Sequence, residues 1–148
     1  MKIDLVLLRQ ISILSGFFGL VAGFITLIPY INIFSFIFLI CFIAPIVIYL
    51  LAKYDCISLT SVQDGIIIGA LSGFISYLAF SVIYIPISIL LIKLFGYSAN
   101  QGIALLLGNA NLFILVIVSI FMGVLSATVN AFTGFLAYYV MEFLSRVK

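Results

Sequence analysis

The chain has 148 residues, 67% of them hydrophobic, and its mean hydropathy of +1.51 lies far above that of a soluble domain. Its six basic and four acidic residues give a net charge of +2 and are too scattered to form a nucleic-acid surface. No histidine is present, which excludes histidine-ligated haem, the common zinc sites and catalysis by a histidine base. The composition predicts an integral membrane protein.

Four apolar runs are separated by short polar segments. We expect each run to form a helix that crosses the bilayer, because backbone polar groups in hydrocarbon must be satisfied within the segment itself. The predicted fold is therefore all-α, a single transmembrane domain over residues 1–148 with four transmembrane helices. The predicted spans are residues 11–28, 33–51, 65–92 and 112–143.

Small residues recur at every fourth position in three of the runs, which places them along one face of each helix. Such a face lets a second helix approach closely, so we predict that spans one, three and four pack through these glycine-rich faces. The predicted helix-packing residues are Ser15, Gly19, Gly23, Gly65, Gly69, Gly73, Ser119, Gly123, Ala127 and Ala131. On this interpretation, leucine at Gly69 disrupts folding far more than leucine at Gly96.

Residues 19–26 match residues 69–76 in the pattern Gly-x-x-x-Gly-Phe-Ile followed by Thr or Ser. This match suggests an internal repeat of two hairpins that run in the same orientation. Convergence of two glycine-faced helices would explain the match equally well.

The second run lacks glycine and contains Pro45. We expect this span to lie at the periphery and face lipid, because it has no small-residue face. Pro45 should kink the helix, since proline has no amide hydrogen and its ring clashes with the preceding turn. Cys41 and Cys56 would be about 20 Å apart along a helix, beyond disulfide reach, so we expect free thiols.

The third run opens with helix-start signals at residues 60–64. Ser61 and Asp64 have the spacing of a capping box. Thr60 and Gln63 offer the same spacing one residue earlier. We expect Asp64 to cap the helix, because an acid in the first turn complements the helix dipole. The alternative is an ion or proton site beside the glycine face.

The third run also continues beyond the thickness of a bilayer. From Gly65 to Phe95 it would measure about 46 Å as a helix, against a hydrocarbon core of about 30 Å. Residues 86–110 are therefore an apolar interfacial segment, a re-entrant segment or part of a long tilted helix. The sequence leaves these alternatives open.

Asn130 is the one amide well inside an apolar span. An unpaired amide in hydrocarbon costs several kcal/mol, so Asn130 should face protein, with Ser72 or Ser76 as the expected partner. Ser126 and Thr133 extend this polar stripe along span four. These five residues form either interhelical hydrogen bonds or a polar path.

The basic residues predict the orientation. With four spans, five of them fall on one side of the membrane, namely Lys2, Arg9, Lys53, Arg146 and Lys148. Lys93 alone falls on the other side. This bias places both termini in the cytoplasm, and we expect a multi-pass protein of the plasma (inner) membrane.

No catalytic constellation is visible. None of the four acids lies at mid-membrane, where a coupled proton would need a site, and no nucleophile with a base or metal-ligand cluster is present. We therefore expect no enzyme and no cofactor. The predicted function is a structural, interaction or accessory-subunit role, with the bilayer and a second copy or a larger membrane complex as partners and no nucleic acid. The alternative is a small transporter or channel-like protein with a polar path near Asn130, Ser72 and Ser76.

Overall fold

The computed structural model of the chain describes residues 4–57, 61–98, 101–109 and 111–147. Within these ranges the chain forms helices and no strand, so the predicted all-α class is confirmed. The helices are α1 (Leu5–Ile25), α2 (Asn32–Cys41), α3 (Ile43–Lys53), α4 (Val62–Phe95), α5 (Gln101–Asn109) and α6 (Leu112–Val147). Lys2, Thr60 and Lys148 lie outside the described residues, as does the side chain of Arg146.

Three of these helices, α1, α4 and α6, are long and apolar enough to cross a membrane. The helices α2 and α3 meet at a bend of 58°, and as a pair they would make a fourth span. Each of the four predicted runs is thus helical. The helices extend past the predicted spans, since α1 begins at Leu5 and α6 continues to Val147.

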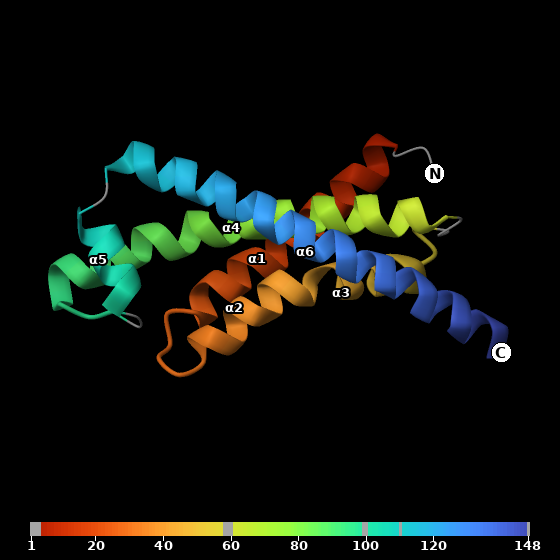
Figure 1. The fold of residues 1–148 in the computed structure, drawn as a ribbon, viewed down its shortest axis with the longest axis horizontal. Coiled ribbons are helices and arrows are strands. Elements are labelled where there is room, and N and C mark those ends of the chain that lie inside the picture. The colour runs from red at the N-terminus through yellow and green to blue at the C-terminus, as the bar shows by residue number, and fades with distance from the viewer. Residues whose placement is uncertain (1–3, 58–60, 99–100, 110, 148) are drawn as a thin grey trace.

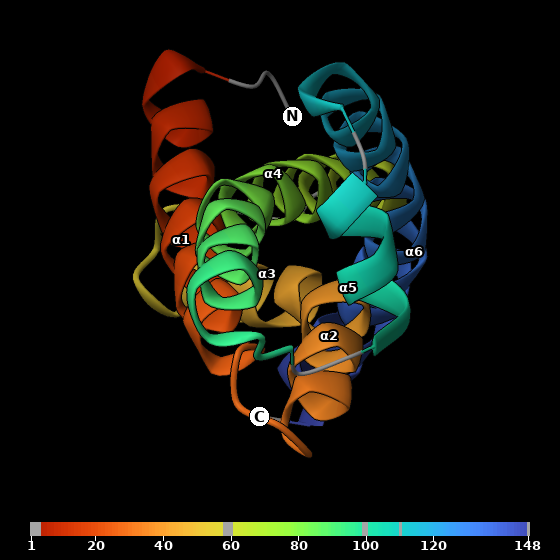
Figure 2. The same cartoon turned by 90° about the vertical axis from the view of Figure 1, so that its left-hand side faces the viewer.

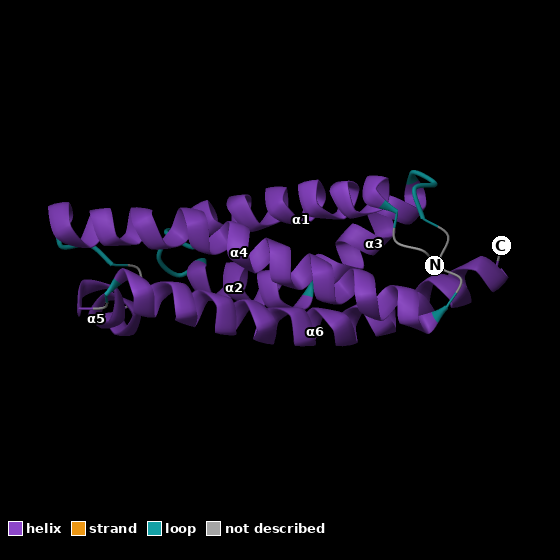
Figure 3. Cartoon of the chain, turned by 90° about the horizontal axis from the view of Figure 1, so that it is seen from above, coloured by secondary structure: helices purple, strands orange, loops and turns teal. Residues whose placement is uncertain are grey.

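The central helix is α4. It packs against α1 on one side and against α6 on the other, and the broken pair α2–α3 lies beneath all three (Figure 2). Both termini lie at one end of the molecule, and α5 lies crosswise at the opposite end (Figure 1). The long helices lie side by side along the molecule when it is seen from above (Figure 3). The chain therefore crosses the length of the molecule an even number of times.

The contact between α4 and α6 brings two backbones together. A Cβ atom added at Gly69 would overlap the carbonyl oxygen of Asn130, and one at Gly73 would lie 2.6 Å from the carbonyl oxygen of Ser126. Real Cβ atoms essentially never come this close to a neighbour. The two helices can therefore keep this separation only with glycine at these positions.

On α6 the predicted contact face is right at Gly123, which is buried and whose Cβ position lies 3.2 Å from the Phe74 ring of α4, but it differs further along the helix. Ser126, Asn130 and Gly134 are buried against α4, and a Cβ atom at Gly134 would overlap the carbonyl oxygen of Gly65. Ala127 and Ala131, which we placed on this face, are only half-buried, as is Ser119. The face is thus centred one position away from the alanines.

Contact between α1 and α4 is similarly close. A Cβ atom added at Gly19 would overlap the carbonyl oxygen of Ser76, and one at Gly23 would lie 3.2 Å from the carbonyl oxygen of Phe80. The two helices run in the same direction, as the suggested repeat requires. Their hairpin partners differ, because α6 is continuous and packs along α4, whereas α3 packs mainly against α4 and α6 rather than α1.

The expectation that the second span lies outside the packed core was wrong, although one of its faces, with Phe34 and Phe42, is exposed. Its residues Leu39, Ile43, Val47 and Ile48 are fully buried and belong to the hydrophobic core. The small-residue faces of α1 and α6 are both occupied by α4, which leaves a gap beside the three helices. Bulky branched side chains fill such a gap at the density of a protein interior, so a span without glycine suits this place.

Turn and cap chemistry holds the helix ends. The hydroxyls of Thr26 and Ser35 hydrogen-bond each other at 2.9 Å between α1 and α2. At the start of α4, Ser61 and Asp64 form the predicted capping box, in which the Ser61 amide donates to the carboxylate at 3.0 Å. At its end, Gly96 adopts the left-handed conformation with φ 61°, which other residues rarely adopt.

We predict opposite effects of alanine at two helical glycines. Gly69→Ala should lower stability by about 1–3 kcal/mol or more, because the new methyl group meets backbone atoms of α6. Gly16→Ala should be neutral or should raise stability by up to about 1 kcal/mol, because in the described part of the chain no atom beyond its own turn of helix lies within 4 Å of its Cβ position. Thermal aggregation of the purified protein in detergent measures both.

Gly16 is a better control than Gly96, the position compared with Gly69 in the sequence analysis. Any side chain at Gly96 is strained by the left-handed backbone there, whatever the surrounding space. Equal melting temperatures for the two alanine variants would contradict close packing at Gly69.

Candidate functional site

The side chain of Asn130 lies at the break between α2 and α3. Its Oδ1 accepts a hydrogen bond from the Ala44 amide at 2.9 Å, and its Nδ2 donates to the Ile40 carbonyl at 2.7 Å. In a continuous helix these two backbone groups would bond to each other. The carboxamide of Asn130 therefore stands between them and satisfies both, as a buried backbone requires.

Pro45 accounts for the position of the break. The helix α2 ends at Cys41, α3 begins at Ile43, and Phe42 between them has φ −114°. The proline ring would clash with the carbonyl of Cys41, four residues earlier, in a straight helix. The predicted kink is confirmed, and it lies at Phe42 rather than at the proline itself.

The expected partners of Asn130 were wrong. The Ser76 hydroxyl donates to the Gly73 carbonyl of its own helix at 3.1 Å, and the Ser72 hydroxyl has no hydrogen-bond partner among the residues that the structure describes. Glycine at position 73 is the reason, because it lets the Asn130 side chain lie directly over α4 and reach α2–α3 beyond it. A Cβ atom added at Gly73 would lie 2.8 Å from the Asn130 Nδ2.

The two remaining polar residues of the predicted stripe, Ser126 and Thr133, bond to backbone carbonyls. The Ser126 hydroxyl donates to the Gly73 carbonyl at 3.0 Å and so joins α6 to α4. The Thr133 hydroxyl donates to the Asn130 carbonyl at 3.2 Å within α6. Ser72, Ser76 and Asn130 are 0% exposed. Among the described residues, these side chains line no opening to the surface.

Asp64 is buried, with 3% of its surface exposed, and its carboxylate accepts the capping hydrogen bond from Ser61. The two cysteines are free thiols, as expected. Cys41 is half-buried and Cys56 is exposed. Across the described parts of the chain, no three His, Cys, Asp or Glu residues gather where they could hold a metal ion.

A cleft that the sequence analysis missed lies between α2, α4, α5 and α6, in the half of the molecule that contains α5. Its volume is about 440 Å³. Tyr77, Phe80 and Tyr84 of α4 form its floor, and the rings of Phe80 and Tyr84 stack with centroids 5.0 Å apart. Phe36 of α2 meets Phe80 edge-on at 6.3 Å. The site is therefore apolar and walled by aromatic rings.

The same face of α4 explains both the close contact and the cleft. Gly65, Gly69 and Gly73 occupy this face along the first half of the helix, and Tyr77 and Phe80 continue it at helical spacing. Where the face is glycine, α6 touches the backbone. Where it is aromatic, the rings hold α6 away, and a cleft remains. The change from glycine to aromatic residues after position 73 is the sequence signal that could have revealed it.

The chain matches no protein-family model, no curated protein and no solved structure. Two features of the structure bear on function, namely the buried polar contact at Asn130 and the apolar cleft.

We predict that Asn130→Leu destabilises the protein by about 2 kcal/mol or more, because it leaves the Ala44 amide and the Ile40 carbonyl unpaired in a buried place. Thr128→Val on the same helix is the control, since the Thr128 hydroxyl is exposed and bonds only to its own helix. Thermal unfolding in detergent measures the difference.

A double-mutant cycle with Pro45→Ala sharpens this prediction. Without the proline, α2 and α3 can close their own backbone hydrogen bonds, so Asn130→Leu should cost less in that background. An equal cost in both backgrounds would mean that the carboxamide does not act through the break.

Proposed function

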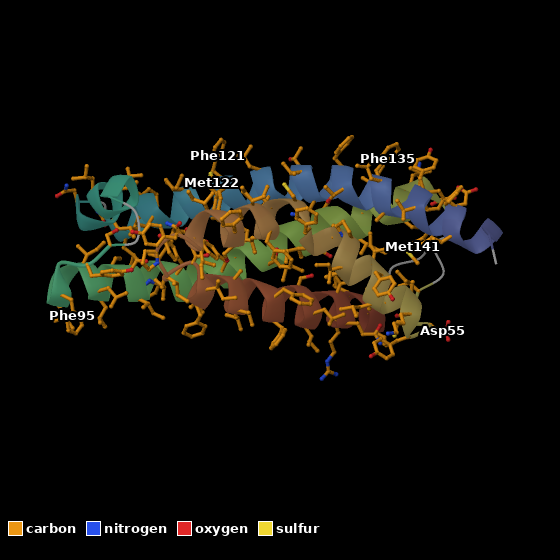
Figure 4. The ribbon with its side chains drawn as sticks, turned by 90° about the horizontal axis from the view of Figure 1, so that it is seen from below. Asp55, Phe95, Phe121, Met122, Phe135 and Met141 are labelled. Atoms are coloured by element: carbon orange, nitrogen blue, oxygen red, sulfur yellow. The ribbon has the colours of Figure 1, made fainter. Side chains whose placement is uncertain are left out.

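We propose that the chain is a four-span integral membrane protein of the plasma (inner) membrane, with α2–α3 as its second span and both termini in the cytoplasm. The outward faces of α1 and α6 support this location, because they carry exposed large apolar side chains, such as Phe17 on α1 and Phe121 on α6 (Figure 4). Charge supports the orientation, since Lys53 lies at the end of α3 near the termini and Lys93 lies near the opposite end of the molecule.

We further propose a structural or accessory-subunit role rather than transport or catalysis. The single observation that carries this proposal is the state of the buried polar groups. The carboxamide of Asn130 is bonded on both of its polar atoms to protein backbone, and Ser72 and Ser76 are fully buried beside close helix contacts. A solute path along these residues would require the hydrogen bonds at the α2–α3 break to open.

This role places the interaction surface on the outside of the bundle. The inner small-residue faces of α1 and α4 are already occupied by each other and by α6. A second copy or a larger membrane complex would therefore contact the outer faces of α1 and α6, where the side chains are aliphatic and aromatic. Contacts between such faces in lipid rest on shape and van der Waals packing.

We predict that the interior does not react with a water-soluble thiol reagent. Ser76→Cys and Ser126→Cys, each in a background with Cys41→Ser and Cys56→Ser, should remain unlabelled in membranes, because both positions are buried in close helix contacts. Labelling at a rate within tenfold of that of native Cys56, which is exposed, would instead favour the channel-like alternative.

The same reagent tests the orientation. A membrane-impermeant maleimide should label native Cys56 in inside-out vesicles and not in right-side-out vesicles, because Cys56 follows α3 at the end of the molecule that carries the termini. The reverse pattern would invert the proposed topology.

We predict that the protein leaves the membrane as part of a larger particle. In a mild detergent, the protein mass measured by light scattering should be at least twice the 16.3 kDa of one chain. A harsh detergent should release the monomer, because contacts between lipid-facing surfaces are weak. A monomer under both conditions would contradict the accessory role.

A further inference from the structure

We propose that the cleft between α2, α4, α5 and α6 binds one acyl chain of a membrane lipid. This inference rests on the proposed membrane location and goes beyond the proposed structural role, because it assigns a ligand to this chain. Four observations carry it, namely where the cleft opens, how its wall is built, what its hydroxyl groups bond to and how large it is.

The exposed residues that line the cleft lie on α2 and α6 and, at Leu106, on α5. Its floor residues on α4 are buried, with Phe80 only 3% exposed. Its rim residues are exposed and aliphatic, with Ile33 of α2 at 62% and Val118 of α6 at 49%. A mouth bordered by exposed aliphatic side chains between two spans faces the acyl chains of the bilayer rather than water.

The wall is mostly apolar, and its polar side chains are Thr26, Asn32, Ser81, Ser119, Tyr77 and Tyr84. The Ser81 hydroxyl donates to the Tyr77 carbonyl at 3.0 Å, and the Ser119 hydroxyl donates to the Leu115 carbonyl at 2.8 Å. The Thr26 hydroxyl likewise donates to the Ala22 carbonyl, at 2.7 Å. These three hydroxyls are thus bonded to their own helices. A water molecule needs two to four polar partners, so this lining favours hydrocarbon.

The size of the cleft favours a flexible chain. Its volume of about 440 Å³ is roughly three times that of the ~150 Å³ apolar cavity that holds the six carbons of benzene. At the same packing it holds a hydrocarbon of roughly eighteen carbons, which is one acyl chain.

The experiment uses the full chain reconstituted in dioleoyl phosphatidylcholine vesicles that contain phosphatidylcholine with a diazirine on one acyl chain. Photolysis inserts the carbene into nearby C–H bonds, and mass spectrometry locates the adducts. Met122 lines the cleft, whereas its neighbour Phe121 projects from the outer face of α6 with 62% exposure (Figure 4). We expect at least threefold more adducts on Met122 and Tyr77 than on Phe121, because a bound chain stays longer than a passing lipid.

Two matched variants test the position of the site. Val118 and Ile117 are neighbours on α6 with nearly equal exposure, 49% and 50%, but only Val118 lines the cleft. Val118→Trp should fill the mouth and reduce the adducts on Met122 and Tyr77 at least fivefold. Ile117→Trp should leave them unchanged. Both variants should keep the adducts on Phe121, which reports that they are inserted in the bilayer, and both should keep the unfolding temperature of the native protein, which reports that they are folded.

The outcomes separate this inference from the proposed function. Adducts on Phe121 with no excess on Met122 would overturn the acyl-chain site and leave the membrane location intact. An absence of adducts on Phe121 as well would overturn the membrane location itself. Labelling of Ser119→Cys by a water-soluble thiol reagent would mean that the cleft is aqueous. A loss of the excess on dilution, in step with dissociation of a dimer, would assign the cleft to a second copy. The thiol-labelling result and the dilution result would each overturn the proposal.

Discussion

The contact between the glycine face of α4 and the backbone of α6 is the constraint on which the rest of the structure depends. It is a contact between two main chains, since a Cβ atom at Gly69 would overlap the Asn130 carbonyl and one at Gly73 would press on that of Ser126. In water these interior glycines would weaken α4 by roughly 1 kcal/mol each. In a bilayer, where helices do not gain from burying apolar surface against each other, close packing of this kind is what holds them together.

That contact also determines how the buried amide is used. Because residue 73 has no side chain, the Asn130 carboxamide passes over α4 and reaches the break in the second span, where it bonds to the Ala44 amide and the Ile40 carbonyl. Pro45 opens the break, and Asn130 satisfies the backbone groups that it exposes. The polar centre of the molecule is therefore a structural element. Because the Asn130 carboxamide is bonded to backbone groups, an accessory role is better supported than a polar path through the membrane.

The two halves of α4 carry different residues on the same face, and these residues determine how closely α6 packs against it. In the half nearer the termini, the glycines allow the backbone of α6 to contact that of α4. In the other half, Tyr77, Phe80 and Tyr84 hold α6 away and form the floor of the cleft. Close packing and an apolar cleft are thus produced by the same stripe of residues, with only the side-chain volume changed.

The sequence by itself determined the helical class, the apolar runs, the capping box at Ser61 and the kink caused by Pro45. Each of these depends on near neighbours in the chain, through hydropathy, hydrogen bonding within one turn or the proline ring. Only the tertiary structure decided that the second span is buried, that Asn130 bonds to α2–α3 rather than to Ser72 or Ser76, and that Gly134 joins the contact with α4. These depend on which surfaces remain after the closest helices have packed. Helical periodicity gives the faces of each helix, but it does not say which helix each face meets.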